Sequence, residues 1–286
     1  GPEPTVSKTP SPAAVPEPGG TVTFTVSFDN TAAGAITLTG LSDDVFGDLL
    51  DPANPAVANN TCPLQPASIP GGGSFSCSFD AYVAGDAGDP DHVDTVTAFL
   101  VDGDGRPGTG SATATVPFTD VPPALTVAKV PSVTSVAEPG GTVTFSVAVE
   151  NASVEGVTLN SLTDDVFGDL LDPVNPAVAN NTCPLQPAAI PVGGTFSCSF
   201  DALVTGDAGD PDHVNTVTAV VADDEGGQAT GFDGAAVGFD DVLPGVAVAK
   251  SVVPGSLPEP GGVVAFTVEV SNPSVEPVTL TALTDD

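Results

Sequence analysis

The sequence has no tryptophan, no methionine and one tyrosine, and only four of its 286 residues are lysine or arginine. Aspartate and glutamate number 37, so the formal net charge is −33. Binding to nucleic acid requires a basic surface that releases counterions from phosphate, and adsorption to anionic membranes requires one too. The composition therefore excludes nucleic acids and anionic membranes as partners. Because so acidic a chain repels itself, bound cations or high salt should stabilise it.

Catalytic signatures are also lacking. The sequence has no Gly-x-Ser-x-Gly elbow, no His-Glu-x-x-His and no P-loop. Its two histidines, His92 and His213, occupy equivalent loops, which favours an exposed or supporting role over a general base. Acidic pairs are abundant, but glycosidases hold theirs in a cleft with aromatic walls, and aromatic residues are scarce here. We therefore expect a protein that is not an enzyme.

No run of about 18 apolar residues exists, so the sequence predicts no membrane-spanning helix. Proline and glycine number 30 and 32, yet hydrophobic residues make up 41% and alternate with polar ones. Disordered chains lack that pattern, so we expect a folded chain. No signal peptide is visible, and because the first residue lies at a repeat start we expect a segment or a mature form.

A unit of 121 residues repeats along the chain. The stretch DDVFGDLLDP at 43–52 recurs at 164–173 and begins again at 285, and Lys8 recurs with the same step as Lys129 and Lys250. Self-similarity at a fixed period is the signature of a repeat architecture, and this period is near a common domain size. We predict one repeat over 1–121, a second over 122–242, and the N-terminal part of a third, strands A–C, over 243–286.

Each repeat reads as a series of short strands separated by turns. In Thr21–Phe28 polar and apolar residues alternate, which is typical of a half-buried antiparallel strand. The other predicted strands of the first repeat are Thr5–Thr9, Ala35–Leu41, Ser74–Val83, Val93–Val101 and Ser111–Phe118. No segment has sustained helical periodicity. The pattern predicts an all-β fold of antiparallel sandwiches.

Several segments of the repeat carry a family resemblance: Glu17–Phe24, Asp43–Asp48, Thr61–Pro63, Phe75–Phe79, Asp94–Ala98 and Asp102–Gly105. With these segments the chain resembles, over its whole length, the tandem Ig-like repeats of bacterial and archaeal cell-surface proteins. The resemblance implies an exported stalk, adhesin or extracellular fibre, located outside the cell or at its surface.

Each full repeat has one pair of cysteines, Cys62 with Cys77 and Cys183 with Cys198. No third cysteine or histidine lies near them, which disfavours zinc. A disulfide in each pair would close a loop of about 16 residues and add about 3 kcal/mol, whereas the alternative is two buried free thiols. Disulfides would indicate an oxidising, extracellular compartment.

Acidic residues gather in loops that should share one end of the sandwich. Successive strands run up and down, so loops A–B, C–D and E–F lie where the chain leaves a repeat, and loops B–C and F–G lie where it enters. Carboxylates about 4 Å apart repel by about 4 kcal/mol at an effective dielectric of about 20, so such a cluster needs a counter-ion. Ca²⁺ accepts many hard oxygen ligands in irregular loops, whereas softer metals prefer histidine or thiolate.

We therefore predict Ca²⁺ at the junction between consecutive repeats, where it would stiffen the array. The candidate ligands are Glu17, Asp43, Asp44, Asp48, Asp86, Asp89, Asp91, Glu138, Asp164, Asp165, Asp169, Asp207, Asp210, Asp212, Glu259, Asp285 and Asp286. Asp44, Asp48 and Asp89 are preferred among them. The loops lack the EF-hand pattern, and the alternative is an acidic surface that serves solubility or salt adaptation.

Asn59, Asn151 and Asn180 begin N-glycosylation sequons, so glycans are candidate additions.

Taken together, the sequence predicts an extracellular structural protein that forms a filament or a cell-surface stalk. The alternatives are an adhesin and a carbohydrate-binding surface module. Because the third repeat stops after strand C, we expect that the chain continues or that a second copy completes the repeat by strand addition in a head-to-tail polymer.

Overall fold

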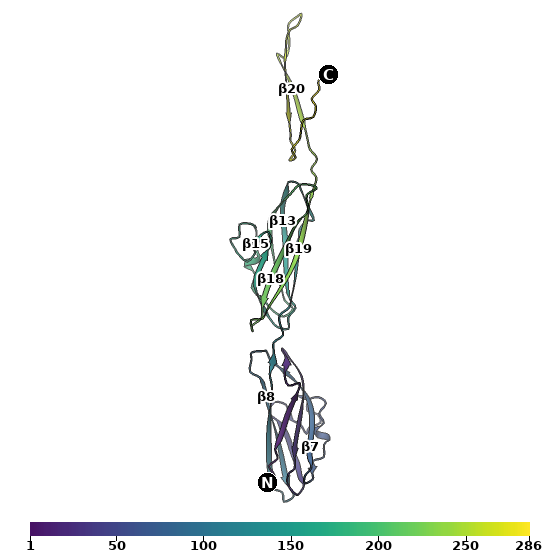
Figure 1. The fold of residues 1–286 in the computed structure, drawn as a ribbon, viewed down its shortest axis with the longest axis vertical. Coiled ribbons are helices and arrows are strands. Elements are labelled where there is room, and N and C mark those ends of the chain that lie inside the picture. The colour runs from purple at the N-terminus through teal and green to yellow at the C-terminus, as the bar shows by residue number, and fades with distance from the viewer. The chain divides into compact units, whose positions relative to one another are not determined.

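The computed structural model describes residues 1–286, which divide into two compact units (Figure 1). Unit 1 comprises Gly1–Pro123 together with two short loops, Ser153–Glu155 and Asp223–Gly227. Unit 2 comprises Ala124–Ala152, Gly156–Ala222 and Gln228–Asp286. The fold is all-β, as the alternating pattern predicts, and its helices are two 3-10 turns at Cys62–Leu64 and Cys183–Leu185. Neither turn has the length or the apolar character needed to cross a bilayer.

Unit 1 is an Ig-like sandwich of two antiparallel sheets. One sheet has the order β1 (Val6–Ser11), β3 (Gly19–Asp29), β7 (Ser74–Ala84). The other has the order β5 (Gly47–Asp48), β4 (Ile36–Asp43), β8 (His92–Asp102), β9 (Pro107–Val116), with β6 (Ser68–Ile69) also on β4. In addition, β2 (Val15–Pro16) pairs in parallel with β10 (Phe118–Thr119), which brings the segment before β3 to the end of the chain in this unit.

The inward faces of the two sheets share one apolar core. Alternate residues of β3 are buried, from Val22 to Phe28, as the alternation predicts. Phe24 stacks on Phe79 of β7 with ring centroids 5.4 Å apart, and Phe46 after β4 packs edge-on against Phe79 at 5.9 Å. Full burial of such a side chain contributes about 1.5–3 kcal/mol, so this core supplies the main driving force for folding.

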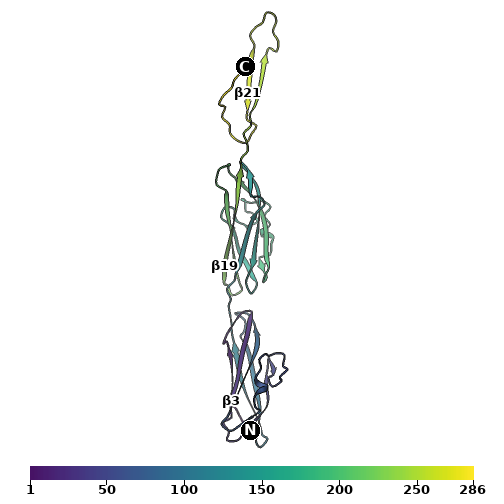
Figure 2. The ribbon, with the colours of Figure 1, turned by 90° about the vertical axis from the view of Figure 1, so that its right-hand side faces the viewer.

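Unit 2 contains the same sandwich. One sheet has the order β11 (Leu125–Pro131), β13 (Gly140–Asn151), β17 (Thr195–Thr205). The other has the order β12 (Ser135–Ala137), β19 (Gln228–Asp240), β18 (His213–Ala222), β14 (Val157–Asp164), β15 (Gly168–Asp169), with β16 (Ala189–Ile190) on β14. β19 is continuous where unit 1 has β9 and β10. The last strands, β20 (Ala247–Val253) and β21 (Ala265–Ser271), form an antiparallel hairpin (Figure 2).

The segment between β4 and β7 is held to its sheet by covalent and polar contacts. Cys62 is bonded to Cys77 and Cys183 to Cys198, with Cα atoms 4.9 and 4.8 Å apart, so both predicted disulfides are present and no cysteine is free. In unit 1, Asp80 of β7 accepts hydrogen bonds from the Thr23 hydroxyl at 2.6 Å and the Asn59 amide at 2.7 Å. Asn59 thereby fixes the loop over the outer face of β7.

Candidate metal site

Glu17 is the centre of a group of acidic side chains in unit 1. It lies in the turn between β2 and β3 and is only 3% exposed. Its two carboxylate oxygens accept backbone N–H groups from distant segments, Ala87 at 2.8 Å and Val121 at 2.7 Å. Burial alone would raise the pKa of Glu17, but these N–H groups outweigh burial and hold the pKa below its usual value. Glu17 is therefore a fixed anionic anchor.

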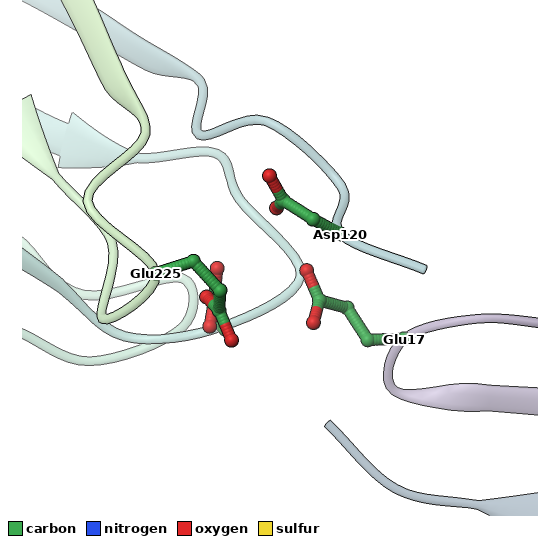
Figure 3. Close-up of side chains that lie close together, drawn as sticks. Glu17, Asp120 and Glu225 are labelled. Carbon is green, nitrogen blue, oxygen red and sulfur yellow. The ribbon is translucent and has the colours of Figure 1, made fainter. Parts of the chain in front are cut away.

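Three further carboxylates converge on Glu17. One oxygen from each of Glu17, Asp120, Glu155 and Glu225 lies within 4.8 Å of the others, and Figure 3 shows the side chains of Glu17, Asp120 and Glu225 close together. Asp120 follows β10, and Glu155 and Glu225 come from the two short loops that belong to unit 1. A second group consists of Asp86, Asp224 and Glu225, and it adjoins the first because Glu225 belongs to both.

Like charge and burial perturb these carboxylates. Burial, followed by a hydrogen bond with Asp224 and the charge of Glu17, raises the pKa of Glu155 to about 8. Burial and a hydrogen bond with Glu17 raise the pKa of Asp86 as well. The side chains of Lys8, Lys129, Lys250 and Arg106 pair with carboxylates outside both groups. The lysine and arginine side chains of the chain therefore place their charge elsewhere.

Asp223 is a further buried carboxylate in the loop that contributes Glu225. It is only 8% exposed, and neither of its carboxylate oxygens has a hydrogen-bond partner. Desolvation and then the charge of Asp223 raise the pKa of Asp120, so Asp223 faces the group that contains Asp120. Burying a carboxylate without a partner is costly, and proteins normally pair such a group or use it to bind a metal.

Unit 2 has a smaller group around the equivalent glutamate, Glu138. One oxygen from each of Glu138, Asp207 and Glu276 lies within 4.8 Å of the others, and each residue lies 121 positions after its counterpart in unit 1. Glu138 accepts the backbone N–H groups of Ala208 and Val242, both at 2.6 Å. The N–H groups of Val242 and Ala208 lower the pKa of Glu138 to about 2. The same anchor thus occurs in both units.

The structure gives a different role to Asp43, which had been expected to bind the metal. Asp43 is buried, its carboxylate lies 2.5 Å from the Nζ of Lys8, and it accepts the backbone N–H groups of Val45 and Phe46 at 3.0 Å. Asp164 pairs with Lys129 at 2.5 Å in the same way. The prediction missed these ion pairs because it treated the lysines only as markers of the repeat.

The other acids of the 43–52 loop also bond to nearby backbone. Asp44 accepts the N–H of Thr95 at 2.7 Å, and Asp48 accepts that of Leu50 at 2.9 Å, a turn-forming bond that short acidic side chains often make. Asp165 and Asp169 repeat these bonds with Thr216 and Leu171 in unit 2. Asp89, Asp91, Asp210, Asp212, Glu259, Asp285 and Asp286 also lie outside the carboxylate groups, and Asp285 pairs with Lys250.

Of the predicted ligands, the structure therefore brings together Glu17 with Asp86 and Glu138 with Asp207. The candidate list omitted Asp120, Glu155, Asp224 and Glu225 in unit 1 and Glu276 in unit 2. A sequence signal existed for Glu155, because it recurs as Glu276 with the step of the repeat. No such signal existed for the other loop, where the second repeat departs from the first.

The glycosylation sequons differ in accessibility. Asn151 is 1% exposed and donates its amide to the Ile190 carbonyl at 3.0 Å, so the folded chain does not present this amide at its surface. Asn59 and Asn180 lie on exposed loops with left-handed φ values of 48° and 47°. The amide of Asn180 donates to Asp201 at 2.7 Å, as that of Asn59 does to Asp80.

No protein-family model matches the sequence, and no curated protein matches it. A Ca²⁺-stabilized adhesin with which an Antarctic bacterium binds ice is 18% identical, with a TM-score of 0.27 over 86% of this chain and 52% of that one. Mouse nectin-like molecule 4 is 15% identical, with a TM-score of 0.25 over 90% of this chain and 67% of that one.

Red sea bream transglutaminase is 13% identical with a TM-score of 0.27, and the match covers 82% of this chain but only 31% of that enzyme. At such TM-scores none of these similarities carries a functional argument.

Proposed function

We propose that this chain is an extracellular structural protein whose Ig-like repeats bind Ca²⁺ and serve as a cell-surface stalk or filament. The observation that supports the proposal is the recurrence of one carboxylate group, built around Glu17 in unit 1 and around Glu138 in unit 2. A solubilising acidic surface would not require buried anchors held by backbone N–H groups at the same place in each unit.

The donor set suits calcium. In unit 1 the two adjoining groups offer six carboxylates and no histidine or cysteine, and Asp223 adds a buried carboxylate beside them. Ca²⁺ takes about six to eight oxygen ligands at about 2.3–2.6 Å and tolerates uneven loops, whereas Mg²⁺ requires a tighter octahedron. Oxygens on one Ca²⁺ lie at most about twice the ligand distance apart, and the separation of 4.8 Å or less within each group satisfies this limit.

Cation binding would order the loops of unit 1. Glu17 already ties three segments together, and a metal shared with Glu155 and Glu225 would hold the loops Ser153–Glu155 and Asp223–Gly227 in place. Burial is the main cause of the raised pKa of Glu155, and a bound cation would offset both this cost of burying the charged form and the repulsion from Glu17. We propose that this ordering stiffens a chain of repeats.

The disulfides support an extracellular location. Each unit has one, and disulfides form and persist in oxidising compartments such as the cell exterior. For partners we propose further copies of the same repeat, in a longer chain or in a head-to-tail polymer, and a mechanical role instead of catalysis. Sedimentation and electron microscopy of the purified chain with Ca²⁺ separate filament from stalk, since only a filament-forming chain polymerises.

Calorimetric titration of CaCl₂ into chelator-treated protein tests the calcium site. Glu225→Gln removes one ligand charge from an exposed side chain and should weaken binding at least tenfold in unit 1. Asp104→Asn is the matched control, because Asp104 occupies the equivalent position of the first repeat, pairs with Arg106 at 2.7 Å and lies outside both groups. Absence of Ca²⁺ binding at millimolar concentration, or equal loss in both variants, contradicts the proposal.

A further inference from the structure

Lys129 is buried inside unit 2 with no side-chain exposure. Its Nζ donates to Asp164 Oδ2 at 2.5 Å and to the backbone carbonyl of Asn215 at 3.3 Å. Lys129 belongs to β11 in one sheet, whereas Asp164 ends β14 and Asn215 lies on β18, both in the other sheet. The lysine therefore spans the sandwich.

The surroundings of the amine are apolar. The Nζ of Lys129 lies 4.8 Å from the ring centroid of Phe145 and 6.0 Å from that of Phe200, both of which are fully buried. Burial lowers the pKa of Lys129, although the hydrogen bond and charge of Asp164 oppose this. A desolvated lysine that reaches its neutral form is a nucleophile.

Asn215 presents a carboxamide to the same carboxylate. Its side chain is fully buried, and its Nδ2 donates to both oxygens of Asp164 at 3.2 and 3.0 Å. Its Oδ1 is buried with no hydrogen-bond partner. Asp164 thus touches both the amine of Lys129 and the nitrogen of the Asn215 amide, as a group that moves a proton from one to the other must do.

We propose that Lys129 and Asn215 become joined by an isopeptide bond between Nζ and Cγ, with Asp164 as the proton-transfer group. Asp164 takes a proton from the Lys129 ammonium, and the neutral amine attacks Cγ of Asn215. The Nζ–Cγ bond forms and the Cγ–Nδ2 bond breaks. Asp164 then passes a proton to Nδ2 and takes one from Nζ, so that Nδ2 leaves as ammonia. The one proton left over stays on Asp164 or leaves with the ammonia as ammonium. No oxidant, reductant or cofactor enters.

Unit 1 contains the corresponding groups with one difference. The Nζ of Lys8 contacts Asp43 at 2.5 Å and also Asp94, which stands where unit 2 has Asn215. One ammonium here faces two fully buried carboxyl groups, and burial raises the pKa of Asp94. A protonated Asp94 is the acyl donor, so the Lys8–Asp94 bond forms with loss of water and Asp43 transfers the protons.

A plain buried ion pair is the competing explanation, and it leaves the mass of the chain unchanged. The cross-links would join the two sheets of each sandwich covalently, β11 to β18 in unit 2 and β1 to β8 in unit 1. The cross-links do not require calcium, since none of these residues belongs to a carboxylate group of the metal site.

Intact-mass spectrometry of the full chain after disulfide reduction tests the bonds. We expect a mass below that of the sequence by one ammonia and one water. Tandem spectra of a protease digest should contain branched peptides that join Lys129 to Asn215 and Lys8 to Asp94. A measured mass equal to that of the sequence overturns both bonds. A loss of ammonia alone overturns the Lys8–Asp94 bond, and a loss of water alone overturns the Lys129–Asn215 bond.

Variants exclude unrelated losses of ammonia, such as cyclisation of an asparagine. Lys129→Arg and Asp164→Ala should each restore the mass of one ammonia while the water deficit of unit 1 persists. Lys250→Arg is the matched control, because this lysine is 41% exposed and its change should leave both deficits. Resistance of Cys183 and Cys198 to alkylation before reduction reports that unit 2 has folded. An ammonia deficit that survives in Lys129→Arg overturns the proposal, and if that variant does not fold, the branched peptide of the unmodified sequence decides.

Discussion

Replacing Glu17 by alanine tests whether this side chain is an anchor of unit 1. The change removes two hydrogen bonds from a charged acceptor, to the backbone N–H groups of Ala87 and Val121. Hydrogen bonds to charged groups contribute about 1.5–3 kcal/mol each. Ala87 is buried, so its N–H loses its partner outright, whereas Val121 is half-buried and its N–H can recover water. We therefore expect a loss of about 3 kcal/mol in the free energy of unfolding.

Differential scanning calorimetry in the presence of a chelator measures this loss without a contribution from bound metal. For a unit of about 120 residues, 3 kcal/mol corresponds to a fall of about 12 °C in Tm. The two units have separate cores, so only the transition of unit 1 should move. Glu259→Ala is the control, because Glu259 is the third-repeat equivalent, is exposed and should change stability by less than about 0.5 kcal/mol. Equal shifts in both variants would refute the anchoring role.

Three further predictions concern unit 1, the pH dependence and the cross-link. Replacing Cys62 and Cys77 together by alanine should destabilise unit 1 by about 3 kcal/mol in denaturant unfolding, through loss of a loop constraint, and a change below about 1 kcal/mol contradicts that. The hydrogen bond from the Thr144 hydroxyl is the main cause that holds the pKa of Asp201 below 3.8, so the stability that this bond gives is full at neutral pH and is lost as the pH falls through and below that value. Thr144→Val should therefore flatten the acid limb of a plot of Tm against pH. An unchanged acid limb would contradict this prediction. Asn215→Asp should replace the loss of ammonia by a second loss of water in the intact mass, and restoration of the full mass would show that the carboxamide is required.

The strands were predictable because their sequence pattern is local. On β3 the alternation from Val22 to Phe28 decides which face is buried, and the disulfides followed from one pair of cysteines per repeat. The ligand prediction was poorer because it depended on where side chains point. Asp43 and Asp48 lie near each other in sequence, yet one turns into the core to Lys8 and the other bonds to its own turn. A loop assignment cannot distinguish these outcomes.

The few basic residues explain why two different kinds of acidic site arise. Three of the four cations are the repeat lysines, and Lys8 and Lys129 have no side-chain exposure. These two lysines sit against buried aspartates inside the sandwiches, so they do not neutralise the carboxylates around Glu17. The carboxylates around Glu17, which include Glu155 with its raised pKa, therefore lie apart from these lysines and form the site for which we propose Ca²⁺. The calcium site and the cross-links should be separable, because the lysines act only within each core. A variant that no longer binds calcium should therefore still form the cross-links.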